Sequence, residues 1–388
     1  MAVAVYITII FLGSFCTCFI LGRWVMTRAK VEGVVMGVNI FGVSRLLLLY
    51  VLCFGVGWVF LEVGMPLPFM IGPLMLTAFL YISGLMKAAV PAKIRPCGQM
   101  IIASTVGLAF TSEALAVIFE MGLAIIGLAV LTGLSALLVS LLLKRFTRLD
   151  YSTALLCTIP TSPVEAAVIA ERFGLNKAVV VLSQTIRIAS VVVIVPIALY
   201  VMDGWPGNAE RSSGGVGQFD PGGVLLLAIS ALTGAMLFRL LRLPNPYFFG
   251  ALLVSAAVSS SGLHVAPYPS LIMAAAQVVL GTWLGSVFTK DLFLEVRLTL
   301  SIVISMLFFL LLTSLMAVAF AVLSGFPWEV MLLSAAPGGV TEMALTAQFL
   351  GYNVAVIVSF QIVRICIFMP GVHWFIAVAR RFELGRSS

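Results

Sequence analysis

Long stretches without charge constrain this chain more than any other feature of its sequence. Apolar runs of about 20 residues or more, with Lys or Arg only at their boundaries, occupy residues 2–22, 67–86, 121–143, 243–263 and 298–323. A helix needs about 20 such residues to cross a hydrocarbon core of about 30 Å. Because lipid offers no hydrogen-bond partners to an open backbone, these runs must be helical. The sequence therefore predicts an all-α membrane protein.

Composition excludes several classes of function. Charged residues make up 10% of the chain, whereas a soluble protein carries about 25%. The net charge of +7 is explained by cationic loops beside a lipid bilayer, and no nucleic-acid partner is expected. The cysteines and the two histidines match no metal or redox spacing, and no nucleophile-elbow or phosphate-loop motif is present. We expect no metal, no cofactor and no enzyme, so that any transport is secondary.

An internal repeat organises the chain. The stretch LPFMIGPLMLTA matches the stretch PNPYFFGALLVSA when the two are aligned on Gly72 and Gly250. Further matches extend the similarity over residues 44–202 and 222–379. The spacing between equivalent residues is constant except for a change of one position at a short indel. Such a fixed spacing indicates duplication of one structural unit.

Each repeat contains six apolar segments, of which the fifth is interrupted. In the first repeat the interrupted segment (151–174) contains IPTSPVE, and in the second repeat the equivalent segment (328–351) contains APGGVTE. Proline removes a backbone donor and glycine permits unusual backbone angles. We expect either a re-entrant hairpin or a broken helix that still crosses the membrane.

Charge favours an inverted second repeat. If the interrupted segments are re-entrant, each repeat crosses five times, and nearly all of the 22 Lys and Arg residues fall on one side, which is then cytoplasmic. If all six segments cross, the repeats are parallel and this asymmetry weakens. With an extra N-terminal helix, the chain is expected to make about 11 crossings, with the N-terminus outside and the C-terminus cytoplasmic.

The expected organisation has five parts. They are an N-terminal helix with a cytoplasmic loop (1–43), repeat 1 (44–202), a Gly-, Ser- and Pro-rich external linker (203–221), the inverted repeat 2 (222–379), and a cytoplasmic tail (380–388).

Ionisable residues are rare within the apolar segments and indicate a candidate site. Each break is followed by a glutamate, and the next helix carries Gln and Arg three residues apart, on one helical face. The candidate substrate- or ion-binding residues are Thr161, Ser162, Glu165, Gln184, Arg187, Pro337, Gly338, Gly339, Thr341, Glu342, Gln361 and Arg364.

Several roles fit these residues. The N-termini of the second half-helices present free N–H groups to an anion. Arg187 and Arg364 fit a substrate carboxylate or phosphate. Glu165 and Glu342 fit a coupling proton, and backbone carbonyls at the breaks fit Na⁺. As an alternative, Glu–Arg ion pairs within each repeat merely clamp the broken segment to the next helix.

The second break resembles the AbrB family of bacterial membrane proteins, which is unrelated to the soluble DNA-binding regulator of the same name. The resemblance covers residues 44–379 and rests above all on the PGG-x-x-E-M element (337–343) and on Gln361 and Arg364. The first repeat departs from this pattern, because Thr-Ser-Pro replaces Gly-Gly. The resemblance implies a transport protein, although some members are labelled ammonia monooxygenase or regulator of gene expression. The monooxygenase label gains no support, since metal ligands are missing.

The interrupted PGG segment also resembles inverted-repeat carriers for organic anions and for sodium–proton exchange, at the level of fold. We expect a secondary transporter of a small anionic or polar solute in the bacterial cytoplasmic (inner) membrane, working by alternating access with H⁺ or Na⁺. One alternative is a membrane sensor that affects gene expression through a partner, against which the short loops count. A membrane-bound oxygenase ranks last. Substrate, direction, coupling ion and homo-oligomeric state stay open.

Overall fold

The computed structural model describes residues 40–86, 89–147, 149–161, 163–203, 220–243, 245–289 and 296–384. The expected N-terminal helix, Ser162, most of the external linker and the end of the C-terminal tail lie outside these ranges. The chain divides into two compact units, Met1–Leu47 and Leu48–Ser388. The described part of the first unit is the beginning of one helix, and everything that follows concerns the second unit.

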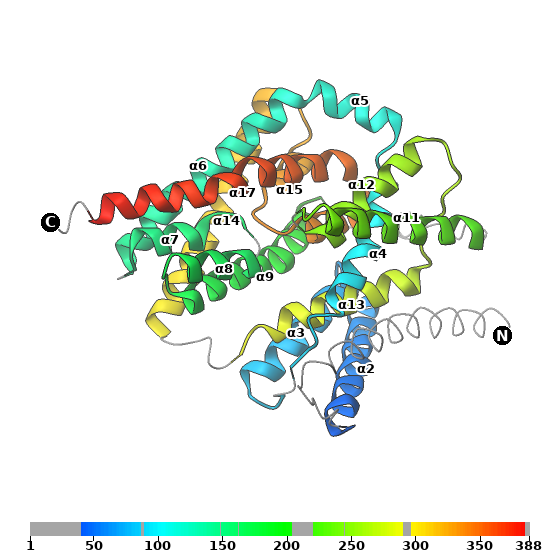
Figure 1. Ribbon diagram of the computed structural model, residues 1–388, viewed down its shortest axis with the longest axis horizontal. Helices are drawn as coiled ribbons and strands as arrows, with labels where there is room; N and C mark the ends of the chain where they lie inside the picture. The colour runs from blue at the N-terminus through cyan, green and yellow to red at the C-terminus, as the bar shows by residue number, and fades with distance from the viewer. Residues whose placement is uncertain are drawn as a thin grey trace. The chain divides into compact units, whose positions relative to one another are not determined.

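All regular structure in the described ranges is helical (Figure 1). The helices are α2 (Ile40–Glu62), α3 (Pro68–Ile82), α4 (Arg95–Gly107), α5 (Ser112–Glu120), α6 (Gly122–Phe146), α7 (Tyr151–Thr158), α8 (Pro163–Arg172), α9 (Lys177–Asp203), α11 (Pro221–Leu240), α12 (Pro246–Ser260), α13 (Ser270–Ser286), α14 (Val296–Ser324), α15 (Trp328–Ala335), α16 (Val340–Leu350) and α17 (Val354–Leu384).

Among the described residues, five helices are long and apolar enough to cross a membrane. Their apolar spans are Ser44–Glu62 of α2, Gly122–Phe146, Lys177–Met202 of α9, Pro221–Leu240, and Arg297–Ser324 of α14. Helices α4 and α5 add a sixth span if the bent pair counts as one. The all-helical membrane class is thereby confirmed, and the count of about 11 crossings stays a prediction.

Three apolar segments form helices shorter than a full crossing requires. Helices α3 and α12 have 15 residues each and α13 has 17, against about 20 for a straight span. Helices α3 and α12 both start after a left-handed residue, Leu67 at φ 46° and Asn245 at φ 44°, with proline at the first helical position. Proline suits that position because its fixed φ is helical and its missing N–H would have no partner there. The two starts are separated by the same spacing as Gly72 and Gly250, so the backbone recurs together with the sequence repeat.

Helices from the two halves of the chain contact each other reciprocally at glycines. A Cβ added to Gly107 of α4 would lie 2.8 Å from the carbonyl oxygen of Leu252 in α12. A Cβ added to Gly285 of α13 would lie 2.5 Å from the carbonyl oxygen of Leu74 in α3. Each residue of the first contact is equivalent in the repeat to a residue of the second. Small residues permit this close backbone approach, which stabilises helix pairs in membranes through packing.

Helix α5 is an element that the sequence pattern did not predict. In the sequence an apolar run begins only at residue 121, so the segment before it reads as a connection. Thr111 adopts an extended conformation and its hydroxyl accepts a hydrogen bond from the backbone N–H of Ala114 at 3.2 Å. This N-cap supports a short helix, whose acidic ends made it look like a loop.

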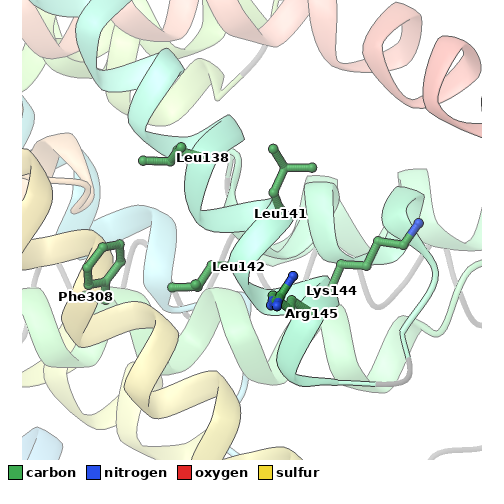
Figure 2. Close-up of a pocket in the computed structure, with 6 residues that line it drawn as sticks. All are labelled: Leu138, Leu141, Leu142, Lys144, Arg145 and Phe308. Atoms are coloured by element: carbon green, nitrogen blue, oxygen red, sulfur yellow. The ribbon is translucent and has the colours of Figure 1, made fainter.

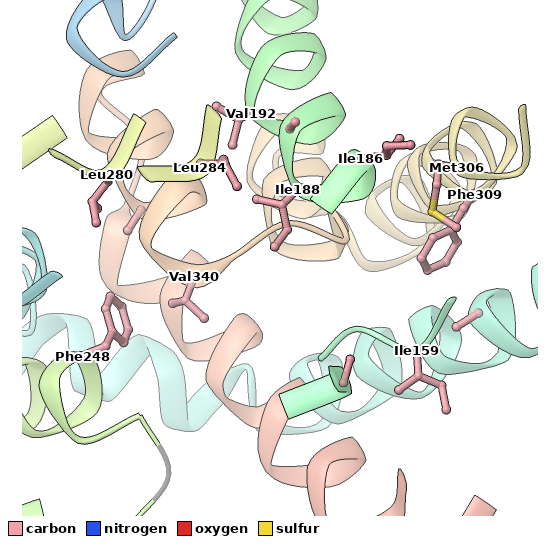
Figure 3. Packing of buried hydrophobic residues seen from close by; sticks show 14 of the residues in the cluster. Ile159, Ile186, Ile188, Val192, Phe248, Leu280, Leu284, Met306, Phe309 and Val340 are labelled. Atoms are coloured by element: carbon pink, nitrogen blue, oxygen red, sulfur yellow. The ribbon is translucent and has the colours of Figure 1, made fainter. Parts of the chain in front are cut away.

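The largest buried apolar cluster includes residues of α7, α8 and α16, whereas the buried residues of α15 belong to a second cluster. Figure 3 shows part of the largest cluster, to which Ile188 and Val192 of α9, Leu284 of α13 and Val340 of α16 belong. The first turn of α16 is therefore packed inside protein, as irregular backbone at membrane depth requires.

Candidate functional site

Both interrupted segments consist of two short helices separated by an extended turn. Helix α7 ends at Thr158 and α8 begins at Pro163, whereas α15 ends at Ala335 and α16 begins at Val340. The chain leaves α7 at Ile159 with φ −58° and ψ 131°, and it leaves α15 at the equivalent alanine with φ −51° and ψ 129°. The predicted breaks are confirmed, and their backbone geometry is duplicated.

At the first break, two side chains of α9 bind the carbonyl end of α7. The Gln184 amide nitrogen donates to the carbonyl oxygens of Leu156 at 2.7 Å and Ile159 at 3.1 Å. The Arg187 guanidinium donates to the carbonyl oxygens of Ile159 at 3.0 Å and Thr161 at 2.9 Å. Both α9 side chains are buried.

At the second break, α17 holds α15 in the same way. The Gln361 amide nitrogen donates to the carbonyl oxygens of Leu333 at 2.8 Å and Ala336 at 3.3 Å. The Arg364 guanidinium donates to the carbonyl oxygens of Ala336 at 2.8 Å and Gly338 at 3.3 Å. Every donor and acceptor is the repeat equivalent of one at the first break.

The physical role of these contacts follows from the helix termini. The last carbonyls of a helix lack intrahelical partners and carry the negative end of the helix dipole. An amide and a guanidinium at each break satisfy those carbonyls and offset that partial charge. Because the alternative is an unsatisfied carbonyl away from water, these four side chains make the interruptions tolerable inside the membrane.

The alternative of a Glu–Arg clamp is not seen at the second break. In the described ranges no ion pair joins Glu342 to Arg364, and the Arg364 guanidinium is bound to backbone carbonyls and to the side-chain oxygen of Gln361. The recorded partners of Arg187 are likewise carbonyls. The sequence suggested an ion pair because Glu and Arg were the charged residues nearby, but the helix ends compete for the same donors.

The two arginines concentrate positive charge between the halves. Arg187 is 3% exposed and Arg364 is 2% exposed, and they lie close enough for Arg364 to repel the charge of Arg187. The Nε atom of each is buried without a hydrogen-bond partner among the described residues, as is Oε1 of Gln184. Buried donors of charged groups are costly when unpartnered. The arrangement therefore favours an anionic or polar ligand near the guanidinium groups.

Glu342 occupies the N-terminal end of α16. A Cβ added to Gly339, the N-cap residue, would collide with the Oε2 atom of the Glu342 carboxylate. Gly339 has φ −78° and ψ 150°, which any residue adopts. Glycine is thus required at this position because any side chain would overlap the Glu342 carboxylate. The Glu342 carboxylate therefore lies beside the start of α16, where the sequence predicts an anion site.

Arg95 is a charged residue near the site that sequence reasoning missed. The charge asymmetry of the sequence predicts a loop position on the cytoplasmic side, but Arg95 begins α4 and lies close enough to Glu342 and Glu165 for both carboxylates to stabilise its charge. Its guanidinium stacks over the ring of Trp283 at 4.0 Å. The repeat gave no signal for this residue, because its equivalent is Met273.

The remaining predicted residues lie around the two turns. Pro337, Gly338 and Thr341 are buried, and a Cβ on Gly338 would lie 2.8 Å from Val191 of α9. The Thr161 hydroxyl is buried without a partner among the described residues. The first turn of α8 contains Glu165, which is partly buried, and nothing is described for Ser162. Apart from Ser162, the structure brings the predicted set together in two groups, one at each break.

Comparison with known proteins agrees with the resemblance seen in the sequence. Residues 86–380 match the family described as "Transition state regulatory protein AbrB". The chain is 28% identical over 283 residues to "Uncharacterized protein YhjN" of Bacillus subtilis, covering 69% of this chain and 74% of that protein. It is 25% identical over 318 residues to "Putative regulator AbrB" of Escherichia coli, covering 79% and 88% respectively. Since the family match spans most of the sequence, including both breaks, the chain belongs to the AbrB family.

Proposed function

We propose that this chain is a secondary transporter that moves a small anion, or a polar solute with an anionic group, across the bacterial cytoplasmic membrane. The observation that carries the proposal is the duplicated break, at which buried arginines brace two half-helices and keep unpartnered Nε atoms. Matching broken segments in inverted halves are the usual position of a transporter site. The finer topology belongs to the same proposal: two inverted repeats, about 11 crossings, and a cytoplasmic C-terminus.

Protons couple to the solute in this proposal, rather than Na⁺. The carbonyls that suggested a sodium site accept hydrogen bonds from Gln and Arg side chains at both breaks. Glu342, by contrast, is a carboxylate that shares the start of α16 with any incoming anion. A proton from the aqueous phase neutralises Glu342, the solute anion takes its place beside the helix N-terminus, and the proton leaves after the anion on the other side. One proton then accompanies each anion.

The charged groups around Glu342 come from several helices. Arg95 of α4 lies close enough to attract its charge. Arg364 belongs to α17, which packs against α16, and its charge repels that of Arg187 of α9. The opposing carboxylate is Glu165 of α8, which shares Arg95. With three cations and one other carboxylate nearby, the site keeps a positive balance when Glu342 is protonated, as anion binding requires.

The test begins with ligand-induced stabilisation. The purified chain is unfolded thermally in detergent with the sodium salts of acetate, lactate, succinate, phosphate and nitrate at equal ionic strength. A ligand of the native state raises the unfolding temperature by mass action. The effective anion is then used, radiolabelled, for uptake into proteoliposomes with and without an inward proton gradient.

Glu342→Gln is the informative variant, and Glu329→Gln is its matched control, because Glu329 also lies in the first turn of a half-helix. We expect Glu342→Gln to bind the anion but to lose the stimulation of uptake by the gradient, while Glu329→Gln behaves as wild type. Failure of every anion to stabilise the wild-type protein contradicts the transport proposal. Full gradient stimulation in Glu342→Gln contradicts the coupling role.

A regulatory role is the second candidate, favoured by the names of the family and of the Escherichia coli relative. In that case the chain acts on gene expression through a partner. Transcript levels in cells carrying Glu342→Gln separate the two functions. An expression effect that survives loss of coupled transport supports regulation, and an effect lost together with transport makes regulation a consequence of the solute.

A further inference from the structure

We propose that the groove between α6 and α14 binds an anionic phospholipid, with an acyl chain along the groove and the phosphate at Lys144 and Arg145. This inference does not depend on what the protein transports. It rests on a hollow in the apolar surface and on the charge at one end of that hollow.

The hollow lies on the outward faces of two candidate membrane spans. It has a volume of about 630 Å³ and is lined by Leu138, Leu141, Leu142, Lys144 and Arg145 of α6 and by Phe308 of α14. This volume lies within the range of pockets that hold small ligands, about 300–1,000 Å³. Figure 2 shows Leu142 and Phe308 directed toward one another from the two helices.

Most of the apolar side chains that line the groove are exposed. Leu138 is 52% exposed, Leu141 is 54% exposed and Phe308 is 39% exposed. On a helix that spans a membrane, side chains of this kind face lipid tails. The groove between them gives a tail contact on two sides, and packing is the force that holds apolar groups together within a bilayer.

Two cations at one end of the groove favour a lipid with an anionic headgroup. Lys144 and Arg145 lie in the last turn of α6. The Lys144 ammonium lies 5.5 Å from the ring centroid of Tyr151, so it is held near the groove end toward α7. Arg145 is exposed, and its guanidinium can bind a phosphate through two parallel hydrogen bonds. Basic residues at the end of an apolar groove between membrane helices are suited to anionic headgroups.

A second copy of this chain fits the groove less well. A symmetric dimer places the same surface of each copy in contact. If its axis ran along the membrane normal, the cations of one copy would meet the same cations of the other. Like charges brought together in this way oppose association, whereas a lipid phosphate neutralises them.

The experiment measures lipid binding to the purified full-length chain by native mass spectrometry. Phosphatidylglycerol and phosphatidylcholine with identical acyl chains are titrated separately. We expect tighter binding of phosphatidylglycerol, and the double variant Lys144→Gln/Arg145→Gln should weaken it roughly 30-fold. The matched control is Arg239→Gln/Arg242→Gln, which removes two exposed cations around the end of α11. It should bind like wild type.

Three further outcomes decide the proposal. Leu141→Ser should weaken binding of both lipids while leaving the preference for phosphatidylglycerol, because it alters the groove and not the cations. Competition by glycerol phosphate, which has no acyl chain, would overturn the acyl part of the proposal. Equal affinity for the two lipids in wild type, or a wild-type dimer that the double variant dissociates, would overturn the lipid assignment. Thermal unfolding in neutral detergent checks that each variant is folded.

Discussion

Gly339 and Ser162 occupy equivalent positions in the two repeats. The glycine leaves the space that the Glu342 carboxylate fills. At the scale of single residues, the two breaks share the Gln and Arg side chains that bind their carbonyls. They differ beside the glutamate, because only the second break has a glycine at this position.

Replacing Gly339 by alanine tests this difference. Backbone angles at Gly339 suit alanine, so the added Cβ acts by displacing Glu342 from the helix start. We expect a loss of about 0.3–1 kcal/mol, the usual worth of an acid at a helix N-terminus, together with loss of gradient-stimulated uptake. Thermal unfolding and proteoliposome uptake measure the two effects. Unchanged coupling in Gly339→Ala would contradict the competition between Glu342 and solute.

Gln361 tests the bracing of the broken helix. Replacement by leucine keeps the volume but removes the donor to the carbonyls of Leu333 and Ala336. Leaving a buried acceptor unsatisfied costs about 1–3 kcal/mol, so the free energy of unfolding should fall by that amount. Gln348→Leu, at an exposed position of α16, is the matched control and should change stability little. Equal stability of the two variants would count against the bracing role.

At the scale of helices, the close approaches at Gly107 and Gly285 tie the two halves of the chain together. Gly107 of the first half lies against the backbone of Leu252 in the second half. Gly285 of the second half lies against the backbone of Leu74 in the first half. Such reciprocity is what a two-fold relation between like surfaces produces. A Gly→Ala substitution at either contact should therefore destabilise its helix pair, α4–α12 or α3–α13, to a similar extent.

Gly285→Ala should separate α13 from α3. The new Cβ would lie 2.5 Å from the carbonyl oxygen of Leu74, which belongs to backbone and cannot rotate away. Overpacking of this kind costs about 1–3 kcal/mol, measurable as a lower unfolding temperature in detergent. Gly55→Ala is the control, because nothing lies within 4 Å of a Cβ at that position. A Gly285→Ala protein as stable as Gly55→Ala would show that the helices are free to move apart.

The sequence predicted the elements and much of the site for identifiable reasons. The long apolar runs without charged residues predict the helices. The Pro and Gly residues that interrupt the same segment of both repeats predict the breaks. The partners of Arg187 and Arg364 were not predictable, because backbone carbonyls have no sequence signature. Arg95 escaped notice because the repeat does not duplicate it, and α5 because a short helix with acidic ends has no long apolar run.

At the scale of the whole molecule, the orientation of the two halves is testable with an equivalent pair of serines. Ser83 and Ser261 occupy matching positions of the repeat at the ends of α3 and α12, and their hydroxyls donate to the carbonyls of Leu80 and Val258. If the repeats are inverted, Ser83→Cys faces the cytoplasm and Ser261→Cys faces outside. The readout is labelling of intact cells by a membrane-impermeant maleimide in a background without native cysteines.

We expect Ser261→Cys to be labelled in intact cells and Ser83→Cys only after the cells are opened. Labelling of both from the same side would mean parallel repeats and an even number of crossings in each. The charge asymmetry used to predict the inversion would then need another explanation.

The pairing of α3 with α13 also has a consequence for synthesis. Helix α3 leaves the ribosome first, and roughly 190 residues separate it from α13, which takes about 10–40 s at about 5–20 residues per second. During that interval the partner of Leu74 does not yet exist. Until α13 is made, α3 must therefore stay in the insertion machinery or in lipid, with the face that contacts α13 unpaired. A stalled or truncated chain would be expected to become a substrate for membrane proteases, whatever the stability of the finished protein.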